Sequence, residues 1–232
     1  MRVLPILFNT EMVRAILDGR KTVTRRLVKF LPGENPNWTG YTKDGLMLYN
    51  GRNEPCCKNP PYQPGDILYV RETWCKNYYH DYGKYFYRAD GEEIDMPLIT
   101  GGTIKYGKAD GLRWRPSIHM PKEAARIWLK VTDVRVERLQ DITEEDAFEE
   151  GYEGICPYEH RVRCGDYESM CYVEGDCENP LRLCDKSVPE GFGIEIWNKT
   201  IKKPDLDRYG WNANPWVWVV EFERCEKPEE KK

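Results

Sequence analysis

Basic side chains gather near the N-terminus, where they could bind an anion. Within residues 10–30 there are six cations against two acids, Glu11 and Asp18. The cations are Arg14, Arg20, Lys21, Arg25, Arg26 and Lys29. The planar guanidinium of Arg donates two parallel hydrogen bonds, which suits a phosphate group. This excess predicts phosphate contacts, and the alternative is a solvated surface balanced by nearby acids.

A second candidate segment follows the turn signal Pro64-Gly65-Asp66 and contains Arg71 and Trp74. Alternation along a strand puts these two side chains on opposite faces. Arg71 is a candidate ligand contact. Trp74 could stack on a base, and the alternative is a place in the core.

A third candidate pair is Ser117 and His119, which share one face if their segment is extended. His119 could contact a carbonyl or a phosphate of a ligand. A single His between Ile118 and Met120 is more often structural, and no Ser-His-Asp pattern surrounds it. We therefore expect ligand contacts here, and no nucleophilic triad.

The cysteines gather in one segment, residues 152–190, which holds five of the nine. Thiolate and imidazole groups are suitable ligands for tetrahedral zinc, but no Cys-x-x-Cys occurs in this segment. A structural zinc site is one hypothesis, and a loop with free thiols is the other. The candidate ligands are Cys156, His160, Cys164, Cys171, Cys177 and Cys184.

Composition restricts the classes of function. The 232 residues carry a net charge of −4, so the field of the whole chain does not attract nucleic acid and any such contact needs a local basic patch. No apolar run approaches the roughly 18 residues of a membrane span, and the N-terminus lacks a small-residue cleavage site. We expect a cytoplasmic protein with reduced cysteines and no membrane partner.

The periodicity predicts a mainly β chain with short helices. Apolar alternation over 127–139 changes phase near Thr132-Asp133, as at a bulge or bend. We expect helices after Asn9 or Thr10 and after Thr143, with Gly19 and Gly151 ending them, and a Gly-rich mobile connection over 98–110. The remaining helical segments are 121–125 and 193–201, and the predicted strands are 4–8, 22–28, 46–49, 67–73, 84–88, 127–139 and 216–222.

The fold class that follows is α+β, mainly β. We expect a partly closed antiparallel β-barrel with short flanking helices, because no βαβ alternation indicates a parallel sheet. Residues 1–225 form a single domain in this interpretation. Two loop insertions interrupt it, at 31–62 and at the Cys-rich segment 152–190, and a disordered tail follows at 226–232.

Four blocks of sequence, taken in order, resemble the ASCH family. The segment 15–26 (Ala-Ile-Leu-Asp-Gly-Arg-Lys-Thr-Val-Thr-Arg-Arg) is similar to the family's opening motif. Residues 63–74 resemble its second block, 131–151 its third, and 215–222 its closing strand. Together with 114–121, these blocks look most like the larger ASCH proteins of phages and prophages.

The resemblance implies a PUA-like barrel in a bacterial or phage-infected cell. Relatives include RNA-binding domains, readers of modified bases and a small amidohydrolase that deacetylates acetylcytidine. The Lys, Thr and Glu of that enzyme fall on Lys21, Thr24 and Glu150. Residues 21 and 24 of one regular strand would point to opposite faces, so this triad requires Lys21 to lie in the turn after Gly19.

Three functional hypotheses follow, and we favour the first. The chain binds nucleic acid, RNA rather than DNA, or a modified nucleotide in a basic cleft. Alternatively it is an amidohydrolase of an acylated pyrimidine nucleoside, with no cofactor required. A third hypothesis is a phage accessory protein whose Cys-rich segment docks a partner. The binding residues expected for the cleft are Arg20, Arg25, Arg26, Arg71, Trp74, Ser117 and His119.

Overall fold

The computed structural model shows a mixed fold that is mostly sheet, with short helices. This confirms the coarse fold class, whereas the partly closed antiparallel barrel stays a prediction. The main sheet has five strands in the order β1-β5-β10-β11-β2. The structure describes residues 1–34, 41–42, 45, 47–76, 85–91, 96–100, 103–107, 114–153 and 187–229.

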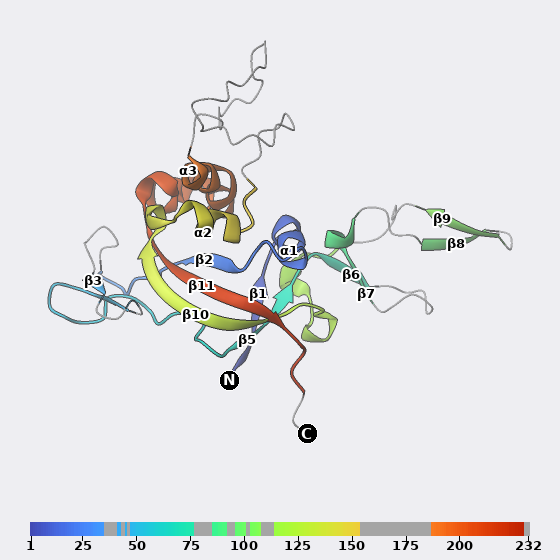
Figure 1. Ribbon diagram of the computed structural model, residues 1–232, viewed down its shortest axis with the longest axis horizontal. Helices are drawn as coiled ribbons and strands as arrows, with labels where there is room; N and C mark the ends of the chain where they lie inside the picture. The colour runs from blue at the N-terminus through green and yellow to red at the C-terminus, as the bar shows by residue number, and fades with distance from the viewer. Residues whose placement is uncertain are drawn as a thin grey trace, which may run out of the picture. The chain divides into compact units, whose positions relative to one another are not determined.

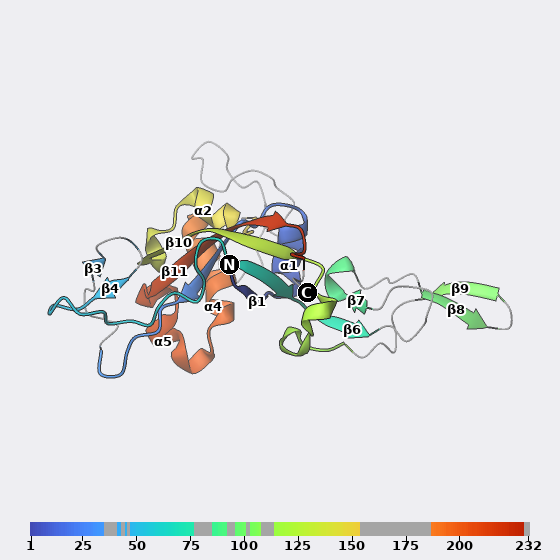
Figure 2. The same cartoon turned by 90° about the horizontal axis from the view of Figure 1, so that it is seen from below.

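Among the described residues, each of the seven predicted strands is found at or near its predicted position, whereas β3, β6, β8 and β9 were not predicted. They are β1 Val3–Leu7, β2 Val23–Leu27, β3 Tyr41–Thr42, β4 Leu48–Tyr49, β5 Ile67–Arg71, β6 Trp74–Lys76, β7 Tyr85–Tyr87, β8 Met96–Thr100, β9 Thr103–Gly107, β10 Trp128–Arg138 and β11 Trp216–Cys225. Outside the main sheet, β3 lies beside β4, β6 beside β7 and β8 beside β9, as short antiparallel pairs (Figure 2).

The helices are short. The α-helices are α1 Thr10–Leu17, α2 Glu144–Glu149, α3 Val188–Phe192, α4 Asn198–Thr200 and α5 Leu206–Tyr209, and η6 Gly193–Trp197 is a π-helical turn. Single 3₁₀ turns are η1 Arg88–Asp90, η2 Ser117–His119, η3 Lys122–Ala124, η4 Leu139–Asp141, η7 Lys203–Asp205 and η8 Trp211–Ala213. Among the described residues, no helix has the length and apolar character to span a membrane.

The chain forms two compact units, each described by itself below. Unit 1 comprises 1–20, 63–132 and 222–232, and unit 2 comprises 21–62 and 133–221. Strands β10 and β11 run through both. The division within β10 falls at Thr132 and Asp133, where two exposed residues in succession interrupt the alternating burial. The predicted change of phase is therefore confirmed.

In unit 1, β1 pairs with β5 in parallel and β5 pairs with β10 antiparallel. The parallel pair corrects the expectation of a purely antiparallel sheet. It is possible because a long connection, which contains α1 and β2, separates β1 from β5. Helix α1 is capped as predicted, since Asn9 Oδ1 accepts the Met12 N–H at 2.8 Å, and Gly19 follows it with φ +77°.

The described residues of the Gly-rich segment 98–110 contribute to the antiparallel β8–β9 pair, which was not predicted, whereas residues 101–102 and 108–110 lie outside the described residues and the expected mobility stays a prediction. Met96 pairs with Gly107, and Thr100 with Thr103. Gly101-Gly102 separates two runs that contain β-branched residues, which is a hairpin signal that the count of glycines obscured.

In unit 2, β2 pairs antiparallel with β11, and helices α2 and α3 lie beside each other on one face of the pair (Figure 1). Val23 of β2 belongs to this core, with Ala147 of α2 and Phe192 of α3. Alternation therefore directs Val23, Arg25 and Leu27 toward the helices and turns Thr24 and Arg26 to the other face.

Candidate functional site

Lys21 lies two residues before β2 and two residues after the turn at Asp18-Gly19, in which the proposed triad would place it. It forms an isolated antiparallel bridge with Glu150, and the side chain has no exposed surface. Its ammonium group donates to Glu150 Oε2 at 2.5 Å, to the Glu150 carbonyl at 2.9 Å and to the Val23 carbonyl at 2.7 Å. Burial lowers the pKa of Lys21, and the Glu150 carboxylate opposes this shift.

Arg25 is equally sealed and is surrounded by acids. Its Nη2 donates to Glu137 Oε1 at 2.8 Å and to Asp146 Oδ2 at 3.1 Å, and Nη1 lies 3.5 Å from Glu150 Oε1. The side chain has no exposed surface, and Nε has no partner among the described residues. Glu150 thus joins Lys21 to Arg25, and we call Lys21, Arg25, Glu137, Asp146 and Glu150 the buried ion cluster.

Helix α2 holds the acids of this cluster in place. Thr143 Oγ1 accepts the Asp146 N–H at 3.1 Å, and Asp146 Oδ2 accepts the Thr143 N–H at 3.2 Å, which is the predicted capping box. Glu150 caps the other end, and Gly151 follows with φ +86°. Asp146 therefore caps the helix and also accepts a hydrogen bond from Arg25.

Thr24 is buried on the opposite face of β2 and pairs with Val220 of β11. We find no hydrogen-bond partner for its hydroxyl in the described part of the chain. Of the predicted triad, the structure brings Lys21 and Glu150 into contact. It also leaves the Lys21 ammonium with all three of its protons donated, which is the arrangement of a charged group rather than of a free base.

Arg26 lines a hollow on the same face as Thr24, and we call it the basic hollow. Its volume is about 320 Å³, and three of its lining residues are cationic while none is acidic. The lining consists of Arg26, Leu27, Lys29, Lys58, Asn59, Pro61, Tyr62 and Trp218. Cations beside aromatic side chains are the combination that nucleotide-binding surfaces use.

Backbone hydrogen bonds build this hollow from three separate segments. Arg26 stands opposite Trp218 in the β2–β11 register. The Lys58 N–H donates to the Lys29 carbonyl at 2.8 Å, which fixes the 58–62 segment beside the end of β2. Lys29, Lys58 and Asn59 are exposed, whereas Trp218 is buried.

Arg26 and Tyr62 are half-buried and interact electrostatically. Burial lowers the pKa of Arg26, although a guanidinium keeps its charge at neutral pH. Burial raises the pKa of Tyr62, with Arg26 opposing the shift, so its phenol is a neutral donor and acceptor.

Arg71 and Trp74, two of the candidate ligand contacts, make contacts within unit 1 itself. The Arg71 guanidinium donates to the carbonyls of Met120 at 2.8 Å and Ile118 at 2.5 Å. Trp74 is buried against Met120 and Ala124, and its Nε1 has no partner among the described residues.

Ser117 and His119 lie in the 3₁₀ turn η2 rather than in an extended segment, because His119 N–H bonds to the Pro116 carbonyl at 3.0 Å. The expectation of a shared face therefore does not apply to them.

Arg20 is exposed, and its guanidinium pairs with Asp18 at 3.0 Å.

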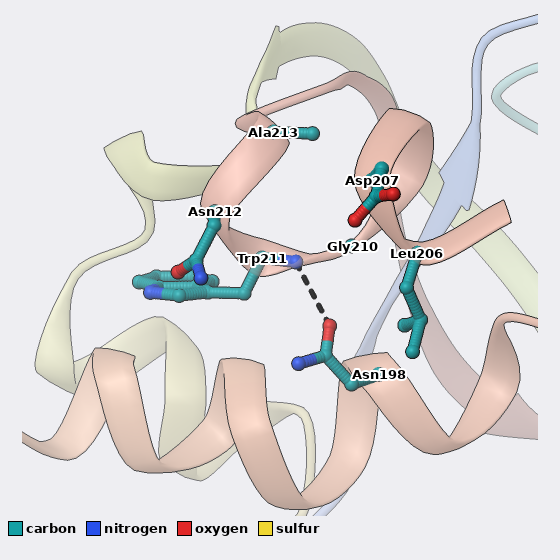
Figure 3. Close-up of a pocket in the computed structure, with 7 residues that line it drawn as sticks. All are labelled: Asn198, Leu206, Asp207, Gly210, Trp211, Asn212 and Ala213. Atoms are coloured by element: carbon teal, nitrogen blue, oxygen red, sulfur yellow. Dashed lines mark hydrogen bonds between the residues drawn. The ribbon is translucent and has the colours of Figure 1, made fainter. Parts of the chain in front are cut away.

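A second hollow in unit 2 lies between α4, α5 and η8 (Figure 3). Asn198 Oδ1 accepts the Trp211 N–H at 2.8 Å and so joins two of its walls. Asp207 is the charged residue among those that line it, so this hollow does not suit a phosphate group.

Most of the basic hollow was not singled out from the sequence. Lys29 counted toward the basic excess but was not proposed to bind a ligand, and Lys58, Asn59 and Tyr62 fell in a segment treated as an insertion. The signal that could have found them is a Lys-Asn pair followed within three residues by an aromatic side chain.

The six proposed zinc ligands, Cys156 to Cys184, lie outside the described residues, so the zinc hypothesis stays a prediction. In the described ranges, no group of three His, Cys, Asp or Glu side chains is placed to hold a metal ion.

Comparison of the chain with protein-family models, curated proteins and solved structures gave no match.

Proposed function

We propose that this protein binds a nucleotide or a strand of nucleic acid through the basic hollow. The observation that carries the proposal is the lining, which joins Arg26, Lys29 and Lys58 to Tyr62 and Trp218 without an acid. The chain as a whole is acidic, with a net charge of −4, so this concentration of positive charge is local. The resemblance of the segment around Arg26 to the ASCH opening motif supports the same function, with RNA as the favoured nucleic acid.

Binding of fluorescein-labelled single-stranded RNA and DNA at several salt concentrations tests this proposal. We expect affinity to fall with salt, because bound cations release counterions from phosphate. Removing Lys29 or Lys58 should weaken binding and lower the salt slope by about 0.7 for each phosphate of a single strand that is no longer neutralised. Lys199→Ala, which removes an exposed Lys of the same unit, is the matched control. Equal binding by the Lys58→Ala and Lys199→Ala proteins would contradict the assignment.

A second candidate function rests on a different observation, the buried contact between Lys21 and Glu150, with Thr24 buried on the other face of β2. It is the hydrolysis of an acylated pyrimidine nucleoside. Deacetylation of acetylcytidine by the wild type and by Thr24→Val tests it, since valine preserves the shape and removes the hydroxyl. Turnover that disappears in the variant would establish the enzyme, and absence of turnover would reject this substrate.

A further inference from the structure

We propose that the basic hollow takes a single unpaired nucleotide, with its phosphate at Lys29 and Lys58 and its base against Tyr62. This inference rests on the proposed function and specifies its ligand. The ligand chemistry is a phosphate joined to a flat, unpaired base. Its source is either a free nucleotide or one residue of a single strand.

The size of the hollow limits the ligand. Its volume of about 320 Å³ lies near the lower end of the range of small-molecule pockets, which is roughly 300–1,000 Å³. A single base with its sugar is a ligand of that scale, whereas a base pair presents twice the ring area and a stacked neighbour on each side. The hollow therefore favours an unpaired nucleotide over duplex.

The exposure of the lining residues sets the orientation. Lys29 and Lys58 are exposed, while Arg26 and Tyr62 are half-buried and Trp218 is buried. The strongly hydrated phosphate group belongs at the exposed ammonium groups. A base fits farther in, where Tyr62 and the planar guanidinium of Arg26 provide flat surfaces, with Trp218 beneath them.

Asn59 can read the edge of the base. Its side chain is exposed at the hollow, and we find no hydrogen bond from it to any other residue that the structure describes. An amide supplies one acceptor and two donors, which match the donor and acceptor pattern of a base edge. Base pairing would occupy part of that edge, which is a second reason to expect an unpaired ligand.

Calorimetric titration of the full chain with four probes tests this inference: a nucleoside, its 5′-monophosphate, a short single-stranded RNA and a duplex of the same sequence. We expect the monophosphate to bind about tenfold more tightly than the nucleoside, as charge-assisted hydrogen bonds to its phosphate allow. The single strand should bind better than the duplex. A monophosphate as tight as the strand would identify a free nucleotide as the ligand, and a tighter strand would identify nucleic acid.

Substitutions assign the roles. Lys29→Ala with Lys58→Ala should remove the preference for monophosphate over nucleoside, and Tyr62→Ala should weaken both about tenfold, as loss of a stacking partner does. Lys199→Ala should change neither, and a thermal melt of each variant confirms folding. Equal binding of nucleoside and monophosphate, or of duplex and strand, would overturn this inference while leaving the proposed function intact. Absence of binding to all four probes would overturn both.

Discussion

Arg25 and Arg26 are neighbours in the sequence, and yet they lie in opposite environments. Arg25 faces α2, has no exposed side-chain surface and contacts Glu137, Asp146 and Glu150. Arg26 faces the basic hollow, where Lys29 and Lys58 add positive charge and no lining residue is acidic. The alternation of side chains along β2 thus places one Arg of the pair in the interior, where acids neutralise it, and the other at an open hollow. In the first environment the charge of Arg25 is neutralised inside the unit, and the second is able to attract an anion.

The largest effect that separates the two regions should follow from Glu150→Ala. This change leaves the buried charges of Lys21 and Arg25 without their shared carboxylate. We expect a loss of about 3–5 kcal/mol in the free energy of unfolding, the usual cost of breaking a buried pair from one side. Urea denaturation measures it. Glu149→Ala, at the adjacent exposed position, should stay within about 0.5 kcal/mol of the wild type.

Replacing Arg25 by Lys should affect mainly stability, whereas replacing Arg26 by Lys should affect mainly ligand binding. Arg25→Lys loses the planar fork that contacts three carboxylates, and we expect about 2 kcal/mol of destabilisation with ligand affinity retained. Arg26→Lys should leave stability within about 1 kcal/mol and weaken nucleotide binding several-fold. Denaturation and binding measured on both proteins decide this. A binding defect in Arg25→Lys that exceeds the defect in Arg26→Lys would reverse the assignment of the two faces.

Chemical labelling of amines should distinguish Lys21 from the Lys residues of the hollow. A lowered pKa makes an amine more reactive, but the Lys21 side chain is fully enclosed. We expect its acylation to be on the order of a hundredfold slower than that of Lys58, which corresponds to an opening free energy of about 3 kcal/mol. Mass spectrometry of peptides after timed labelling gives the rates. Equal rates in the native protein would show that the cluster is open.

The smallest effect should come from Thr24→Val. Thr24 is buried, and we find no hydrogen bond of its hydroxyl among the described residues, so its removal sacrifices none there. We expect the free energy of unfolding to change by less than about 1 kcal/mol in either direction, by thermal or urea denaturation. A loss of several kcal/mol would mean that this hydroxyl has a structural partner, and the division between the two faces would need revision.

Local signals in the sequence were sufficient where they act over a few residues. Asn9 and Thr143 cap their helices as expected, and Gly19 and Gly151 follow the helix ends with positive φ. These features depend on neighbouring backbone groups, which the sequence shows directly. The break at Thr132 was visible in the sequence for the same reason, because apolar and polar residues alternate along a half-buried strand and a break in that alternation is a local feature.

Long-range pairing was not accessible from the sequence in this way. The contact between Lys21 and Glu150 joins residues 129 positions apart, and the sequence indicated it through the resemblance alone. The contribution of Lys58 and Tyr62 depends on a hydrogen bond between Lys58 and Lys29, two segments that show no shared pattern. The segment that contains Lys58 and Tyr62 was treated as an insertion because it is rich in Pro, Gly and Asn. In the structure, Lys58 and Tyr62 line the basic hollow.

Tyr152 and Phe192, at the two ends of the Cys-rich segment 152–190, pack in the same hydrophobic core. Tyr152 and Phe192 meet edge to face with ring centroids 6.5 Å apart, and a Cβ atom at Gly191 would lie 2.3 Å from the Tyr152 hydroxyl. A chain that leaves and returns at such neighbouring points can change its length at little entropic cost, because loop closure depends weakly on loop length. The length of the chain between these two points should therefore have little effect on the stability of the core that holds them.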